Sequence, residues 1–120
     1  MIYTAQEPAD WAGVEAALLD AFRRSQDAAR DGEPVVFVLN QADLLGQRSV
    51  PGAILANALL SGMRTLAAEG HNANAVAVGD DADPEDLQHW LDALSNPTHP
   101  RGVTGELVHV HAAHVGKLPT

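Results

Sequence analysis

The run Pro34-Val35-Val36-Phe37-Val38-Leu39 decides the fold, because it is apolar from end to end. A strand with one face in water would alternate apolar and polar residues, whereas a continuous β-branched and aromatic run is typical of a strand covered on both faces. We therefore expect residues 34–39 to form a central strand of a parallel sheet, with helices packed on both sides.

The segment before this strand predicts an amphipathic helix from Trp11 to about Arg30, since apolar residues recur there at steps of three and four. Pro8-Ala9-Asp10 supply the residues that open a helix, and Asp31-Gly32 end it. Ile2 to Ala5 is predicted as a short first strand, and the sequence leaves open whether it joins the sheet.

The segment after the central strand adds two helix–strand pairs, which complete the order (β)αβαβαβ. This order predicts one α/β domain over residues 1–120: a small three-layer, Rossmann-like fold with three or four parallel strands, three helices and right-handed crossovers. The expected elements are a loop at 40–51, a helix at 52–69, a strand at 73–79, a helix at 84–95 capped by Asp83, a loop at 96–105 and a strand at 106–111.

The helix at 52–69 is expected to be buried on two sides, because it is far more apolar than a helix with one face in water. One narrow stripe holds its polar residues, Asn57, Ser61 and Arg64. One buried side meets the sheet. The other is expected to meet another subunit, because small residues would let a second helix approach closely, although a helix of the same chain could fill the same role: Ala56, Ala58 and Gly62.

Composition excludes several classes of function. The 120 residues carry a net charge of −9, which repels phosphate backbones and anionic membrane surfaces. Cysteine is absent, which excludes disulfides, zinc–thiolate sites and cysteine catalysis. The first residues lack the apolar core of a signal peptide, and no apolar run approaches the roughly 20 residues of a membrane span. We expect a cytoplasmic protein that binds neither nucleic acid nor membrane.

Four fragments, in this order, resemble the later half of the short-chain dehydrogenase/reductase (SDR) family. The fragments are Asp10-Trp11 with the helix and strand that follow, MRTLAAEG at 63–70, NAVAVG at 74–79 and TGELVHVHAA at 104–113. Their counterparts in the family are, in the same order, the subunit-contact helix with the strand that delivers the catalytic serine, the end of the helix with the Tyr-x-x-x-Lys pair, an Asn-x-x-x-Pro-Gly segment and the closing strand. The resemblance implies a half-SDR domain.

The resemblance implies an oxidoreductase, but the chain departs from the family at every catalytic position. In the family a tyrosine donates a proton to a carbonyl, a lysine lowers the tyrosine's pKa, and a serine fixes the substrate oxygen. The only tyrosine and lysine, Tyr3 and Lys117, lie at opposite ends of the chain. The aligned positions are Gly52 or Ile54 for the tyrosine, Ala56 or Ala58 for the lysine, Asn40 or Gln41 for the serine, and Ala17 or Leu18 for a relay asparagine. We therefore expect a pseudoenzyme with no catalytic residues.

The resemblance also implies that the cofactor site has gone. The family's glycine-rich turn belongs to the half that is absent here, so nothing offers backbone amides to a pyrophosphate. Asp80, Asp81 and Asp83 stand where the family faces the nicotinamide and phosphates, and they would repel an anionic dinucleotide. We expect no NAD(P) and no other cofactor.

Three clusters each have a structural and a functional interpretation, and the structural one is favoured each time. His109, His111 and His114 could bind a metal, or end a strand in contact with solvent or a partner. The acidic residues 80–86 could bind a hard cation, or cap a helix beside a solvated loop. The polar residues Asn40, Gln41 and Asp43 could bind a ligand at the end of the central strand, or only terminate it.

A stripe on the helix at 84–95 is expected to belong to the core rather than to a cofactor site. Its members are Leu87, Trp90, Leu91 and Leu94.

These expectations lead to one main hypothesis and two alternatives. The main hypothesis is a non-catalytic SDR-like subunit that works by assembly, as a homo-oligomer or with a full-length SDR, because an uncovered strand edge at Ile2–Ala5 would seek a partner. One alternative is half of a complemented oxidoreductase, whose partner chain supplies the NAD(P)-binding half. The other is a small-ligand-binding protein with its pocket near Asn40–Gly46.

Overall fold

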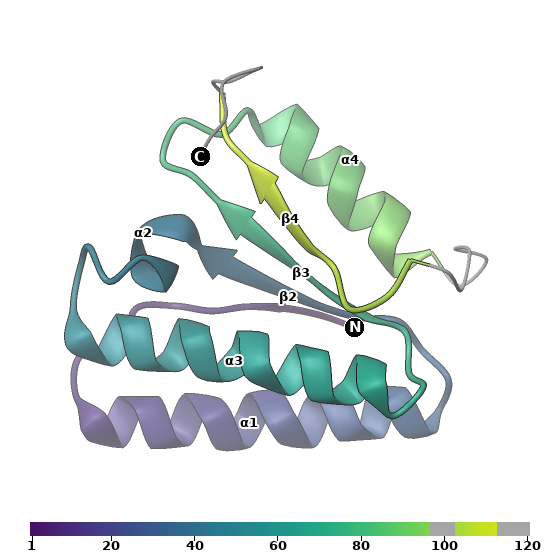
Figure 1. Cartoon of the computed structure of the whole chain (residues 1–120). Coiled ribbons are helices and arrows are strands. Elements are labelled where there is room, and N and C mark those ends of the chain that lie inside the picture. The colour runs from purple at the N-terminus through teal and green to yellow at the C-terminus, as the bar shows by residue number, and fades with distance from the viewer. Residues whose placement is uncertain (97–102, 113–120) are drawn as a thin grey trace.

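A computed structural model, which describes residues 1–96 and 103–112, contains a parallel four-stranded sheet between layers of helices (Figure 1). The strands are neighbours in chain order, and β1 joins the sheet by pairing Ile2 with Val36 through Thr4 with Val38. The predicted α/β class with three layers is confirmed. The strands are β1 (Ile2–Thr4), β2 (Val35–Asn40), β3 (Ala73–Val78) and β4 (Leu107–Val110).

Three of the four helices lie where the sequence predicts them. The prediction of a plain loop at residues 40–51 is wrong, because Asn40 Oδ1 accepts hydrogen bonds from the amides of Ala42 and Asp43 and opens a short helix. The predicted cap residues Asp10 and Asp83 do accept hydrogen bonds from the first turns of their helices. The helices are α1 (Trp11–Arg30), α2 (Gln41–Leu44), α3 (Val50–Ala68) and α4 (Pro84–Ser95).

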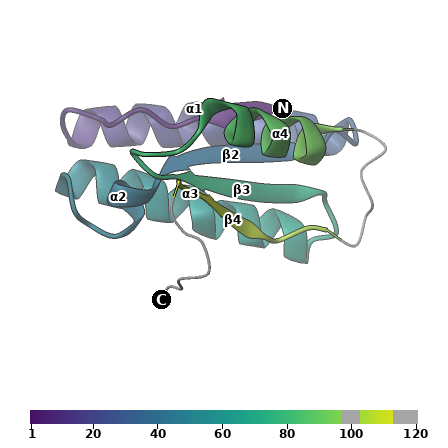
Figure 2. The same cartoon turned by 90° about the horizontal axis from the view of Figure 1, so that it is seen from above.

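The central strand β2 is covered on both faces, as its sequence requires. Val35, Phe37 and Leu39 pack with α1 and α3, whereas Val36 packs with Leu94 of α4. Figure 2 shows the result from above, with α4 on the near side of the strands and α1 and α3 behind them.

The crossover from β3 to β4 has the opposite hand to the first two crossovers. All four strands are parallel and follow one another in order, but α4 lies on the opposite face from α1 and α3. The prediction of right-handed crossovers throughout is therefore wrong. About 98% of such units are right-handed, but here α1 and α3 already fill one face, and only α4 buries Val36 and Val76 on the other.

The second buried side of α3 is covered by α1 of the same chain. A Cβ atom added at Gly62 would lie 2.5 Å from Cε1 of Phe22, so the absence of a side chain at Gly62 lets Phe22 of α1 pack directly on α3. The polar stripe of α3 is exposed as expected, at Asn57, Ser61 and Arg64. The expectation that another subunit covers this side of α3 is therefore wrong, because α1 of the same chain already covers it.

A buried polar network joins β3 to the segment that leads into β4. The Asn74 side chain donates to the carbonyl of Val103 at 3.1 Å and accepts from the amide of Glu106 at 3.0 Å. The Thr104 hydroxyl donates to the carbonyl of His71 at 2.8 Å and accepts from the amide of Ala73 at 3.0 Å. Asn74 and Thr104 therefore tie β3 to the segment that enters β4.

The only tyrosine of the chain fastens β1 to α1. Its hydroxyl donates to the carbonyl of Ala17 at 3.3 Å, and its ring meets Phe37 edge-on at a centroid distance of 6.2 Å. Burial raises the pKa of Tyr3, the charge of Asp20 adds to the rise, and Arg24, 5.3 Å from the ring centre, partly opposes it.

This environment predicts an alkaline loss of stability. Because the folded pKa of Tyr3 is raised, its contribution is complete below the unfolded pKa of about 10 and disappears as the pH rises through the folded value. Urea unfolding should show that the free energy of unfolding falls less between about pH 8 and about pH 11 in Tyr3→Phe than in the wild type. Since Tyr3 is the only tyrosine, its phenolate absorbance reports the titration directly. A titration midpoint of the Tyr3 phenolate at or below the pKa of tyrosine in a free peptide would contradict this interpretation.

Candidate functional site

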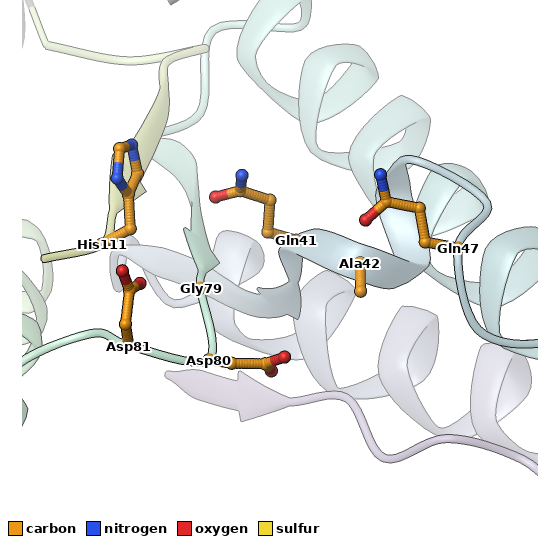
Figure 3. A pocket seen from close by; sticks show the side chains of 7 residues that line it. All are labelled: Gln41, Ala42, Gln47, Gly79, Asp80, Asp81 and His111. Carbon is orange, nitrogen blue, oxygen red and sulfur yellow. The ribbon is translucent and has the colours of Figure 1, made fainter. Parts of the chain in front are cut away.

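The carboxyl ends of β2 and β3 border a small polar pocket of about 240 Å³ (Figure 3). Ligands of open parallel sheets usually bind at this edge. The sequence-predicted polar, acidic and histidine clusters all have residues near it, so it is the candidate site of this fold. The pocket is lined by Gln41, Ala42, Gln47, Gly79, Asp80, Asp81 and His111.

Of the predicted ligand group at the end of β2, only Gln41 lines the pocket. Asn40 instead caps α2. Asp43 is only 5% exposed and forms two hydrogen bonds with Arg48, from Nε to Oδ1 at 2.9 Å and from Nη2 to Oδ2 at 2.6 Å. These hydrogen bonds raise the pKa of Arg48, so the guanidinium stays charged and Asp43 is a structural residue.

The Asp43 carboxylate occupies the space beside Gly52. Gly52 and Ile54 are the two alternatives that the resemblance offers for the family's tyrosine. A Cβ atom at Gly52 would lie 2.5 Å from Oδ1 of Asp43 and 3.0 Å from Oγ of Ser49, which caps α3. A side chain at this position would therefore have to displace the buried Asp43 carboxylate from its contact with Arg48. Ala56, one of the two alternatives with Ala58 for the family's lysine, is buried in the core.

Gly52→Ala tests whether this close approach matters. We expect a loss of about 1–3 kcal/mol in the free energy of unfolding, because the new methyl group pushes Asp43 away from Arg48. In an Asp43→Ala background the same change should be neutral or stabilising, since alanine is the better helix former. Urea unfolding of the wild type, Gly52→Ala, Asp43→Ala and the double variant gives the coupling free energy between the two positions. An equal cost in both backgrounds would rule out the steric explanation.

Gln41 holds an unsatisfied polar atom at the pocket. Its Oε1 is buried and finds no hydrogen-bond donor within the part of the chain that the structure describes. In Figure 3 the amide stands between His111 and Gln47, with Asp80 and Asp81 on the loop below. A buried acceptor without a donor costs about 1–3 kcal/mol, so a donor that entered the pocket would gain affinity here.

Replacing the amide tests whether Oε1 has a donor in solution. If it has none, Gln41→Met should raise the free energy of unfolding by about 1 kcal/mol, because a buried unpaired acceptor is removed. Gln47→Met is the matched control on the same pocket, where we expect little change. Thermal and urea unfolding measure both variants. Clear destabilisation by Gln41→Met alone would mean that a bound water or ligand donates to Oε1.

The acidic cluster is divided between two places. Asp80 and Asp81 line the pocket, whereas Asp83 accepts a hydrogen bond from the amide of Glu85 at 2.8 Å and caps α4. Glu85 and Asp86 are exposed in the first turn of that helix, where negative charge is favourable. The pocket itself therefore carries two carboxylates, which favour a cationic or hydrogen-bond-donating molecule over an anion.

The histidine cluster is not gathered at the pocket. His109 lies on β4 and is exposed, and only His111 lines the pocket, while His114 lies outside the described residues. Across residues 1–96 and 103–112, no group of three or more His, Cys, Asp or Glu side chains is placed to hold a metal ion.

The stripe on α4 is core at three of its four positions. Leu94 is buried, and Leu87 and Leu91 pack against the same cluster. Trp90 is 38% exposed and meets only the His89 ring edge-on among the described ring contacts, so the core prediction is wrong for Trp90. The reason is that α4 is the only helix on this face in the described structure, which leaves its flank open to water.

No family model matches the chain, and no curated protein matches it either. The SDR relationship therefore stays a prediction. None of the helices that the structure describes is long and apolar enough to cross a membrane.

Proposed function

We propose that this protein is a non-catalytic, SDR-like subunit that acts through assembly, either with further copies of itself or with a full-length SDR. A cytoplasmic location, no cofactor, and no nucleic-acid or membrane partner belong to the same proposal. The residues at the aligned catalytic positions support it, because neither Gly52 or Ile54 nor Ala56 or Ala58 offers a proton donor. The hydroxyl of Tyr3 donates to the carbonyl of Ala17 instead.

The observation that carries the proposal is the outer face of α1. Trp11 is 58% exposed and Leu19 is 52% exposed, although both are large and apolar. Leu19 also borders an open groove of about 670 Å³ whose floor includes Leu18 and Phe22. Exposed apolar patches rimmed by charged residues mark interaction sites in otherwise polar surfaces.

The outer edge of β1 adds weaker support. Within the described residues β1 is paired on one side only, with β2, and Ile2 is exposed. An unpaired strand edge presents backbone donors and acceptors that another chain can use. The strand spans only Ile2–Thr4, so this edge would extend a contact rather than create one.

Native mass spectrometry of the protein isolated from its own host tests the proposal. A homo-oligomer, or a complex with a full-length dehydrogenase, is the expected result. A monomer that carries no partner at micromolar concentration would overturn it. If a dehydrogenase is found, its activity should be measured with and without this chain, because activity that exists only in the mixture would favour the complemented-oxidoreductase alternative.

The polar pocket favours one second candidate, the binding of a small molecule. The unpaired Oε1 of Gln41 and the carboxylates of Asp80 and Asp81 suit a ligand that carries N–H donors or positive charge. Such a ligand would appear as extra mass under native conditions and disappear under denaturing conditions. Equal masses in both spectra would remove this candidate.

A further inference from the structure

Three hydrogen-bond acceptors meet at the polar pocket because of the register between β2 and β3. The last residues of these two parallel strands pair with each other, so Gln41 and Gly79, which follow them, leave the sheet at the same level. Asp80 and Asp81 come next in the chain and line the pocket together with Gln41. The pocket is thus bordered by the Oε1 acceptor of Gln41 and by two carboxylates.

The described fold leaves these three acceptors without a partner. Oε1 of Gln41 is buried and has no donor, and neither Asp80 nor Asp81 forms an ion pair within residues 1–96 and 103–112. No lysine or arginine of the described residues lines the pocket. Acceptors and negative charge therefore face this space without a basic side chain to balance them.

The glycine that follows β3 draws the walls of the pocket together. A Cβ atom at Gly79 would lie 2.8 Å from Cβ of His111 and 3.1 Å from Oδ1 of Asp81, so the close approach of both residues requires a glycine. The volume of about 240 Å³ lies below the roughly 300–1,000 Å³ of pockets that hold drug-sized ligands. The pocket therefore suits a charged group of a few heavy atoms.

We propose that this pocket binds the guanidinium group of a small molecule. This inference rests on the second candidate function, small-molecule binding, and names the chemistry of the ligand. A guanidinium is planar and spreads up to five N–H donors around its charge, whereas an ammonium is a compact and strongly hydrated point charge. In Figure 3 the Gln41 amide stands above the loop that carries both carboxylates, so the acceptors are spread around the space and suit the planar donor set.

Other classes of ligand fit these residues less well. Two carboxylates repel an anion, and an apolar ligand would leave Oε1 of Gln41 unpaired. The described residues include no group of three or more His, Cys, Asp or Glu side chains that could hold a metal ion. The proposed ligand is thus opposite in charge to the dinucleotide of the SDR family.

The chain uses the same chemistry beside the pocket. The guanidinium of Arg48 donates from Nε and Nη2 to the two carboxylate oxygens of Asp43, at 2.9 Å and 2.6 Å. The hydrogen bond with Asp43 contributes most to the raised pKa of Arg48, and the charge of Asp80 adds to the rise. A carboxylate of the pocket therefore already acts on a guanidinium of the same chain.

Methylguanidine, methylammonium and methylurea test the class of ligand. Methylurea keeps planar N–H donors without the charge, and methylammonium keeps the charge without the plane. In amide NMR spectra of the full chain, methylguanidine should cause a saturable shift of the Gln41 side-chain amide and of the Asp80 and Asp81 backbone amides. Its dissociation constant should be about threefold or more below those of the other two probes. Equal affinity for either of them would overturn the guanidinium assignment.

Variants test the site. Asp80→Asn, Asp81→Asn and Gln41→Met should each raise the dissociation constant of methylguanidine about threefold or more, because each removes one acceptor. Asp92→Asn is the matched control: it makes the same change of charge on the exposed side of α4 and should leave the dissociation constant unchanged. The same spectra check that each variant is folded. If Asp92→Asn weakens binding as much as the pocket variants do, net charge holds the probe and the site is overturned.

Native mass spectrometry of the protein from its own host separates the two levels of the argument. A bound guanidino compound supports the inference. A second polypeptide that Asp81→Asn loses would place the guanidinium on an arginine of a partner and overturn the small-molecule source. A bound molecule of other chemistry overturns the guanidinium, while small-molecule binding stands. If nothing is bound and no probe shifts the spectrum, both the inference and the small-molecule candidate fail.

Discussion

Burial of β2 on both faces is the constraint on which the rest of the structure depends. A strand that is apolar at every position from Val35 to Leu39 gains stability only if both faces leave water. Two long helices, α1 and α3, cover one face, and their connections leave the other face bare. The chain meets this requirement by sending α4 across the sheet, even though the β3–β4 crossover then has the less common hand.

Most of the fold could be predicted because its signals are local. The spacing of apolar residues predicts a helix from Trp11 to about Arg30, as α1 has it, and Asp10 and Asp83 mark the starts of two helices. The failures concern information that is not local. The hand of the last crossover depends on which face the earlier helices leave free, and the exposure of Trp90 depends on how many helices share that face.

The candidate site could be located from the sequence, but its residues could not be given their roles. The end of a parallel strand predicts the place, and Gln41 and Asp80 do line a pocket there. Nothing in the sequence reveals that Asp43 folds back on Arg48 and fills the space beside Gly52, because that contact depends on how α2 meets α3. Asn74 did carry a usable signal, as a lone polar residue in an apolar strand, which usually means a buried hydrogen-bond network.

The structural uses of the polar residues explain why surface contact is the favoured function. At Gly52, one of the two positions that the family resemblance offers for a catalytic acid, the space is taken by Asp43, which is paired with Arg48. The hydroxyl of the only tyrosine donates to a helix carbonyl. The polar groups at the pocket are the buried Oε1 of Gln41 and the carboxylates of Asp80 and Asp81. A single unpaired acceptor offers little affinity by itself, whereas exposed large apolar side chains, such as Trp11 and Leu19 on α1, offer the apolar area on which the centre of a protein interface depends.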